Sequence, residues 1–554
     1  MEAERELYGP IIDLFKNHFF IASEVPLGPK RIDIVAERDE KIIAIEVKVN
    51  KWKKAFRQAL NYQLGADESY VALPQEYSKP VNQEIFRASG IGLITVEKGG
   101  KAIVIIPARQ STKKSRNYST LIKAHLAEIR QKQKESNNPP RNTDLPFKIY
   151  LWYLANERKY FDSMPQYYDG FIVSAHVLGH LTAAFTALCA KLNKPFFVLP
   201  DTHAFQLAPV SHFLDTKGEI KTSWDKLAKS YGHLINLILL QGRNLQPEDF
   251  LSKQGLWEQT LYDLVSNVIN FQKEQVSLAL SGLVRFLEEP QMKQSNCLVA
   301  PYFFFSSIND PWYQISLKMA QESAKHKGNY RLFAVLCASK SILLSDQAIT
   351  RIPKDFSFPE LDGILLWIQD FDEEDEPTPL LNGFKKLIVS LKEIRKEIIN
   401  LHGKYFSLML CHFGLDGLGT GVCYKETADP THFPTGGPPG GPSPKYYIPE
   451  IKVKRGKIEA ALAIQQLPSL RCNCDICNQE LDYMMDGATP NSISNDLMKR
   501  HFLINKRNEN EHLCTMSLKQ AVSEIRAAYH HYEKNADIVP IEHLKRWAEV
   551  LTKD

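Results

Sequence analysis

Between residues 145 and 424, short apolar segments alternate with longer stretches of helical periodicity. The apolar segments read DGFIVSAHVL, PFFVLPDTHAFQ, SNCLVAPYFFF, YRLFAVLCAS, LDGILLWIQDF and YFSLMLCHFGLDGLGTGV. Strands that alternate with helices indicate a parallel sheet, and a (β/α)8 barrel of the TIM type closes such a sheet economically. We therefore expect an α/β protein with a barrel over residues 145–450 and a helical insertion at about 215–295.

Residues 1–108 predict a separate, smaller α/β domain. A helical pattern over 2–19 precedes strands at 31–36 and 42–49, a helix at 54–65, and strands at 69–74 and 90–98. A basic, polar segment at 109–144 has the composition of a linker. Residues 451–554 are basic and helical in pattern and contain a group of three closely spaced cysteines, which predicts a further subdomain.

Composition limits the classes of protein to consider. Hydrophobic residues make up 44% and charged residues 24%, as in soluble globular proteins. The net charge of +4 does not indicate nucleic acid, and the basic runs at 48–57 and 109–134 are equally typical of solvated helix faces. No segment has the roughly 20 apolar residues of a membrane span. The start MEAERELYGP lacks the order of a signal peptide, and nine cysteines favour a reducing compartment, so we expect a cytoplasmic protein.

Three charged residues interrupt the apolar strands of the small domain. Asp33 lies in RIDIVA, and Glu46 and Lys48 lie in IIAIEVKV, where strand alternation places both on one face. In a hairpin, Asp33 reaches that face too. Two converging carboxylates form an oxygen site for Mg²⁺ or Mn²⁺, and the lysine can polarise a nucleophile. The pattern predicts metal-dependent phosphodiester hydrolysis.

This arrangement resembles the PD-(D/E)XK nuclease superfamily, over residues 1–108. The resemblance implies a restriction-endonuclease-like fold and adds a helical glutamate upstream, Glu4 or Glu6. It also implies roles for Gln58 and Tyr62, which stand one helical turn apart in QALNY and look like the QxxxY element of the RecB-like branch. The proline that names the superfamily is absent before Asp33.

The segment RCNCDICN predicts a structural zinc site. Cys472, Cys474 and Cys477 place three thiolates within one turn, and a cation is needed to neutralise them. Zinc requires a fourth ligand, for which we select His512, with His501 and Cys514 as alternatives. Three close thiolates leave little room for a water ligand, so the expected role is structural.

Three cysteines and a histidine after a barrel resemble the tRNA-guanine transglycosylase family, over about residues 145–535. VLPDTHAFQ is similar to a strand-end element of that family, and the resemblance implies that Asp201 takes part in substrate recognition and proton transfer. A nucleophilic aspartate is implied near the last strand, where Asp416 is the candidate, although the spacing itself points to Gly419. The base-reading aspartate expected after LVAP is absent. Related enzymes exchange 7-deazaguanine bases in DNA.

Three hypotheses for function follow. The first is a nuclease directed by a transglycosylase-like barrel that binds DNA, or less favourably tRNA, and senses a modified base, which by association suggests antiphage defence. The second is an active base-exchange enzyme that uses Asp416 and Asp201. The third makes both domains binding modules in a larger complex, with partner proteins or further copies of the chain. We favour the first, because the nuclease residues are complete and the base-exchange residues are not.

Overall fold

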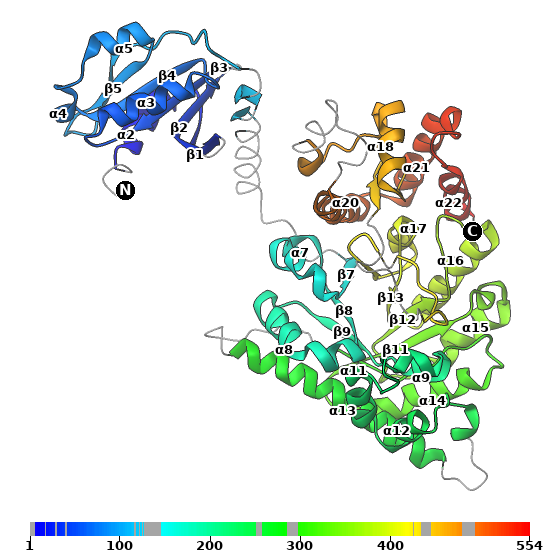
Figure 1. Cartoon of the computed structure of the whole chain (residues 1–554). Coiled ribbons are helices and arrows are strands. Elements are labelled where there is room, and N and C mark those ends of the chain that lie inside the picture. The colour runs from blue at the N-terminus through cyan, green and yellow to red at the C-terminus, as the bar shows by residue number, and fades with distance from the viewer. Residues whose placement is uncertain are drawn as a thin grey trace. The chain divides into compact units, whose positions relative to one another are not determined.

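A computed structural model of the whole chain shows two compact units, Met1–Thr143 and Asp144–Asp554 (Figure 1). The structure describes residues 6–16, 18–27, 30–38, 41–115, 118–120, 122–123, 126, 146–250, 257–284, 297–424, 426–433, 445–478 and 494–553. In this part of the chain, no helix combines the length and the apolar character needed to cross a membrane.

The first unit is built on a six-stranded mixed sheet in the order β1 to β6. Its strands are β1 (Phe20–Leu27), β2 (Lys30–Arg38), β3 (Lys41–Val47), β4 (Glu68–Pro74), β5 (Gly92–Val96) and β6 (Ala102–Ile106). Its helices are α2 (Tyr8–Phe15), α3 (Trp52–Tyr62), α4 (Gln75–Ser78) and α5 (Gln83–Ser89). Among neighbouring strands of this sheet, the pairs β3–β4 and β4–β5 are parallel and the other pairs are antiparallel. The four expected strands and the helix at 54–65 are confirmed, whereas β1 and β6 were not predicted.

The continuous apolar run of β3 reflects its central place in the sheet. Ile43 and Ile45 face the core that includes α2, while Ile42 and Ala44 face the opposite core. A central strand that is buried on both faces has no reason to alternate with polar residues.

The segment that was expected to be a linker begins inside the first unit. Ile122 and Leu126 are buried against the same face of the sheet as Ile42. Lys114 Nζ lies 2.7 Å from a carboxylate oxygen of Asp67. Residues 116–117, 121, 124–125 and 127–144 of the predicted linker lie outside the described residues.

The second unit contains the expected barrel of eight parallel strands, which confirms the fold class. The strands are β7 (Lys148–Trp152), β8 (Gly170–Ser174), β9 (Phe196–Leu199), β10 (Cys297–Val299), β11 (Arg331–Ala338), β12 (Gly363–Ile368), β13 (Glu397–Asn400) and β14 (Gly417–Thr420). β7 and β13 were not predicted. The expected sixth strand is divided, because its first part forms the short helix α17 (Tyr405–Met409) and only its end forms β14.

The barrel is closed at β9 and β10 by side chains. No backbone ladder joins these two strands in the described residues, although they are neighbours. Gln272 of the insertion pairs the edge of β10, because its amide donates to the carbonyl of Val299 at 2.7 Å and accepts from its N–H at 2.8 Å. Thr202 donates its hydroxyl to the carbonyl of Tyr302 and accepts the N–H of Tyr302. The amide of Gln206 donates to the carbonyl of Phe304 and accepts its N–H. These three side chains form what we call the seam.

The expected insertion is helical and joins the outer ring. It contains α11 (Thr222–Tyr231), α12 (His233–Leu240) and the long helix α13 (Trp257–Val284), which carries Gln272. α13 packs against α8 (Ala175–Leu192) and α14 (Pro311–His326). The ring also includes α9 (Thr202–Leu207), α15 (Asp346–Asp355) and α16 (Thr378–Glu393).

The C-terminal part is helical, as predicted, and is attached to the barrel. It consists of β15 (Tyr446–Ile448), β16 (Val453–Arg455), α18 (Lys457–Gln466), α20 (Asn495–Thr515), α21 (Leu518–Tyr532) and α22 (Glu542–Thr552). Trp547 of α22 donates its indole N–H to the carbonyl of Glu373 at 2.7 Å. Lys385 of α16 donates to the carbonyl of Val550 at 3.0 Å, near the end of α22.

Candidate active site and metal centre

The three charged residues of the small domain converge as the hairpin argument predicts. Lys48 Nζ lies 2.8 Å from Glu46 Oε1 and 3.3 Å from Asp33 Oδ2, and it donates to the carbonyl of Val47 at 2.8 Å. Asp33 is held in place because it accepts the backbone N–H of Val47 at 2.7 Å. We call Asp33, Glu46 and Lys48 the sheet cluster. It collects three oxygen atoms around one cationic group.

Tyr62 and Gln58 support the sheet cluster from α3. Glu46 is fully buried, and Tyr62 Oη donates to its Oε2 at 2.5 Å. Burial raises the pKa of Glu46, although hydrogen bonds from Lys48 and Tyr62 lower it in part. Burial also raises the pKa of Tyr62, and Gln58 interacts with the Tyr62 hydroxyl. A buried carboxylate with a raised pKa gains stability from a nearby cation.

The structure adds Glu24 and Tyr8 to the surroundings of the sheet cluster. Glu24 lies between Ser23 and Val25, which flank the position opposite Asp33, and has a left-handed backbone with φ 58°. Tyr8 Oη donates to Glu24 Oε1 at 3.3 Å, and burial and the Asp33 charge raise the pKa of Tyr8. The sequence could have indicated Glu24, because it is the single acidic residue in the apolar run FIASEVPL.

The upstream glutamate implied by the resemblance is not placed at the sheet cluster. Glu6 is exposed and lines a hollow with Pro74, Gln75 and Lys98. Glu4 lies outside the described residues.

The C-terminal part brings together four residues that could hold a metal ion, three of them the predicted cysteines. Cys472, Cys474, Cys477 and His501 offer four ligand atoms that all lie within 4.8 Å of one another. We call these residues the cysteine cluster. His501 Nδ1 lies 3.4 Å from the Cys474 sulfur and 3.1 Å from the Cys477 sulfur. Three thiols and one imidazole fit a closed, structural zinc site.

Surrounding groups orient the histidine of the cysteine cluster. His501 Nε2 lies 2.7 Å from the carbonyl of Tyr447, which leaves Nδ1 to face the sulfurs. The ring of Tyr446 stacks on the imidazole at 4.5 Å, and its hydroxyl lies 3.2 Å from the Cys477 sulfur. The Cys472 and Cys477 side chains lower the pKa of Cys474, which favours a thiolate in the group. A backbone carbonyl on the second nitrogen is typical of a histidine that binds zinc.

His512 is not the fourth member of the cysteine cluster, contrary to the choice made from the sequence. Its side chain is 55% exposed and pairs with Glu524 at 3.1 Å. Cys514 lies 3.4 Å from Asn510 Oδ1 and is also outside the group. His501 takes the position because α20 begins at Asn495 and presents it three turns earlier than His512.

Asp201 stands at the C-terminal end of β9, where barrel enzymes place functional side chains. It is buried, and its Oδ2 accepts the backbone N–H of His176 at 3.0 Å and lies 2.8 Å from His176 Nδ1. Burial alone would raise the pKa of Asp201, but its contacts with His176 outweigh that effect and lower it. The backbone of Asp201 is left-handed, with φ 57°. Trp224 stacks on His176 at 4.7 Å.

Aromatic side chains fill the mouth of the barrel beside Asp201. Trp152 stacks on His402 at 4.9 Å, and Trp367 contacts both His402 and His203. Burial lowers the pKa of His203 to about 4, so this ring is neutral at physiological pH. The chain then covers the mouth itself, because the Trp367 indole donates to the carbonyl of Ala428 at 3.1 Å.

Asp416 lies at the opposite end of the barrel from Asp201. It immediately precedes β14, and its carboxylate accepts from the N–H of Ile398 at 2.9 Å and pairs with Lys392 at 2.8 Å. The barrel therefore does not bring Asp416 and Asp201 together. The glycine run 417–421 is largely buried strand and not a phosphate-binding turn, since a Cβ on Gly419 would lie 2.5 Å from the carbonyl oxygen of Leu401.

No protein-family model matches the sequence, and no curated protein matches it either. Twelve chains of solved structures are similar. They include a GH10 endoxylanase from a sugarcane soil metagenome (9% identity, 47% of this chain and 67% of that chain, TM-score 0.24) and the catalytic domain of a GH26 endo-β-1,4-mannanase from Bacillus sp. JAMB-750 (9%, 55% and 80%, 0.28). A nitroalkane oxidase from Streptomyces ansochromogenes is also similar (10%, 50% and 66%, 0.21). Scores this low carry no argument about function.

Proposed function

We propose that this chain is a metal-dependent nuclease that hydrolyses phosphodiesters at the sheet cluster, in the manner of the PD-(D/E)XK superfamily. The observation that carries the proposal is the convergence of Asp33 Oδ2, Glu46 Oε1 and the Val47 carbonyl on Lys48 Nζ, at 3.3, 2.8 and 2.8 Å. An ordinary structural ion pair needs one carboxylate and one ammonium. Three oxygens around one point, two of them from carboxylates, form the donor set that Mg²⁺ and Mn²⁺ prefer.

The residues present fit such a cation. Asp33, Glu46 and the carbonyl of Val47 would hold it, and the buried Glu46, whose pKa burial raises, would gain most from its charge. When bound, the ion activates a water molecule and neutralises charge on the phosphodiester. Tyr62 fixes the Glu46 carboxylate through its 2.5 Å hydrogen bond. The ion would displace the Lys48 ammonium from between the three oxygens, and Lys48 would then supply a positive charge for the developing phosphorane oxygens.

The barrel, in this proposal, binds nucleic acid and directs the nuclease. The support is the Cys3His group that follows the barrel. In the tRNA-guanine transglycosylase family, which the chain resembles, such a group belongs to a subdomain that holds nucleic acid. That resemblance alone leads us to favour DNA over tRNA as the bound nucleic acid and to propose a role in antiphage defence. Base exchange is the weaker candidate, because Asp416 and Asp201 lie at opposite ends of the barrel.

Cleavage of plain and 7-deazaguanine-containing DNA, and of tRNA, tests the proposal. The full chain is incubated with Mg²⁺ or Mn²⁺ and strand breaks are followed on gels. We expect Glu46→Gln to abolish cleavage and Lys48→Ala to reduce it at least about a hundredfold. Glu68→Gln serves as the matched control, since Glu68 lies on the neighbouring strand β4 and pairs with Lys41 instead.

Metal binding separates this proposal from a purely structural role. Titration with Mn²⁺ should show a site that is lost in Asp33→Asn and Glu46→Gln and kept in Glu68→Gln. Undiminished cleavage by Glu46→Gln would remove the sheet cluster from the mechanism. Release of labelled guanine from DNA or tRNA would instead assign base exchange to the barrel.

A further inference from the structure

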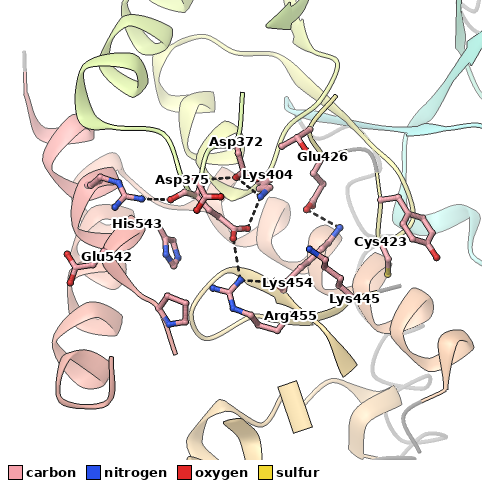
Figure 2. A pocket seen from close by; sticks show the side chains of 15 residues that line it. Asp372, Asp375, Lys404, Cys423, Glu426, Lys445, Lys454, Arg455, Glu542 and His543 are labelled. Atoms are coloured by element: carbon pink, nitrogen blue, oxygen red, sulfur yellow. Dashed lines mark hydrogen bonds and ion pairs between the residues drawn. The ribbon is translucent and has the colours of Figure 1, made fainter. Parts of the chain in front are cut away.

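A cavity of about 560 Å³ lies between the C-terminal face of the barrel and the C-terminal part of the chain (Figure 2). Its barrel wall comes from the segments after β12, β13 and β14, at residues 372, 374, 375, 404, 423, 424, 426 and 427. β13 and β14 are the seventh and eighth strands of the barrel, and barrels of this type often bind phosphate groups with the loops that follow those strands. The volume is typical of small-molecule sites.

The acidic side chains on the barrel wall are largely neutralised. Lys404 Nζ lies 2.6 Å from Asp372 and 3.1 Å from Glu374, and its side chain is only 12% exposed (Figure 2). Arg455 approaches Glu374 from the other wall at 3.6 Å. The exposed Asp375 stands at the rim, where its carboxylate can accept hydrogen bonds from a ligand.

The opposite wall carries a surplus of positive charge. Lys454 of β16 is buried, and its Nζ pairs with Glu426 at 2.9 Å (Figure 2). Behind it, Lys506 shares Glu426 at 3.8 Å and Glu509 at 3.7 Å, while Lys452 pairs with Glu509 at 3.2 Å. In the described part of the chain, these two glutamates are the carboxylates within ion-pair distance of the three lysines.

Lys454 and Lys506 are buried and the Lys452 side chain is 22% exposed, and the three ammonium groups share two carboxylates within ion-pair distance. Burial lowers the pKa of Lys454, although the charge of Glu426 raises it in part. The exposed Lys445 lines the same wall and adds a further cation, and Arg455, which lies 3.6 Å from Glu374, presents its guanidinium to the cavity beside it. Buried charges are stable when paired, so an anion in the cavity would complete the network.

We propose that this cavity binds a nucleoside 5′-monophosphate group, either as a free nucleotide or as the 5′ end of a nucleic-acid strand. Lys454, Arg455 and Lys445 hold the phosphate, since ammonium and guanidinium groups bind its oxygens by charge-assisted hydrogen bonds. Asp375 accepts hydrogen bonds from ribose hydroxyls or base amines. Tyr424, half-buried at the cavity wall, offers a ring face for the base.

This inference rests on the second unit alone and stands apart from the proposed nuclease activity. Calorimetric titration of the full, zinc-loaded chain without added Mg²⁺ or Mn²⁺ tests it. The probes are AMP, adenosine, inorganic phosphate, and a short deoxyadenosine strand with a 5′-phosphate or a 5′-hydroxyl. The variants are Arg455→Ala and Lys445→Ala, with Lys386→Ala on α16 as an exposed lysine outside the cavity.

We expect AMP or the 5′-phosphorylated strand to bind about tenfold or more tightly than its phosphate-free counterpart. Arg455→Ala and Lys445→Ala should each remove most of that difference, and Lys386→Ala should leave it unchanged. Preference for AMP identifies a free nucleotide, and preference for the phosphorylated strand identifies a strand end. Lys454→Met, checked for an unaltered melting temperature, repeats the test at the buried position. Equal binding with and without the phosphate, or binding that survives both alanine variants, would overturn the proposal.

Discussion

Replacement of Glu373 by glutamine should stabilise the second unit, and only at neutral and alkaline pH. Glu373 is fully buried, accepts the N–H of Ser407 at 3.0 Å and its hydroxyl at 2.5 Å, and its own carbonyl holds Trp547 of α22. Burial raises the pKa of Glu373 to about 7, although hydrogen bonds from Ser407 and the charge of Lys404 lower it in part. The fold therefore favours the protonated carboxyl.

The sign and size of the effect follow from that pKa. The unfolded carboxyl titrates near 4.5, so the folded state binds more protons between pH 4.5 and 7. The contribution of Glu373 to stability is complete below pH 4.5 and is lost as the pH rises through 7. The difference amounts to about 3 kcal/mol. For a unit of about 400 residues, this corresponds to a melting-temperature shift of about 4 °C.

Differential scanning calorimetry of the full chain between pH 4.5 and 8.5 measures this. Wild type and Glu373→Gln should melt together at pH 4.5 and diverge above it, with the variant higher by about 4 °C at pH 8. Glu393→Gln, an exposed replacement on α16, should follow wild type throughout. A constant difference between wild type and Glu373→Gln across this range would refute the buried, protonated carboxyl.

Three further outcomes are expected. Tyr62→Phe removes the donor to the Glu46 carboxylate and should weaken Mn²⁺ binding about tenfold, measured by titration of the full chain. His501→Ala should lose the bound zinc by elemental analysis, whereas His512→Ala should retain it; the reverse would restore the original choice of ligand. Gln272→Leu leaves two buried backbone groups unpaired and should cost about 2–4 kcal/mol in thermal unfolding. Gln275→Leu, on the same helix, should cost little, because Gln275 Oε1 has no hydrogen-bond partner among the described residues.

The barrel could be predicted from the alternation of strands and helices, but two of its strands could not. β13 spans only Glu397–Asn400 and contains two apolar residues, Ile398 and Ile399. The run YFSLMLCHF is longer and more apolar, yet it forms α17 and a 3-10 turn. Apolar content alone does not separate a buried strand from a buried helix, and the pairing partner decides.

The site residues that were correctly grouped are those that are close in sequence or on paired strands. Asp33 and Glu46 meet because β2 and β3 pair, and three cysteines within six residues meet without help from the fold. His501 lies on a helix whose start falls after residues 479–493, which are outside the described residues, so spacing could not distinguish it from His512. Asp416 looked like a strand-end residue, but which end of the strand it occupies depends on where β14 begins.

The seam between β9 and β10 makes the barrel depend on its own insertion. At every other junction a ladder of backbone hydrogen bonds joins the two strands. At the seam, Thr202 and Gln206 join the segments that follow the two strands, and Gln272 of the inserted helix α13 pairs the backbone of β10. Removal of the inserted helices would therefore leave buried backbone groups of β10 without partners, so the insertion is part of the barrel wall and not an appendage to it.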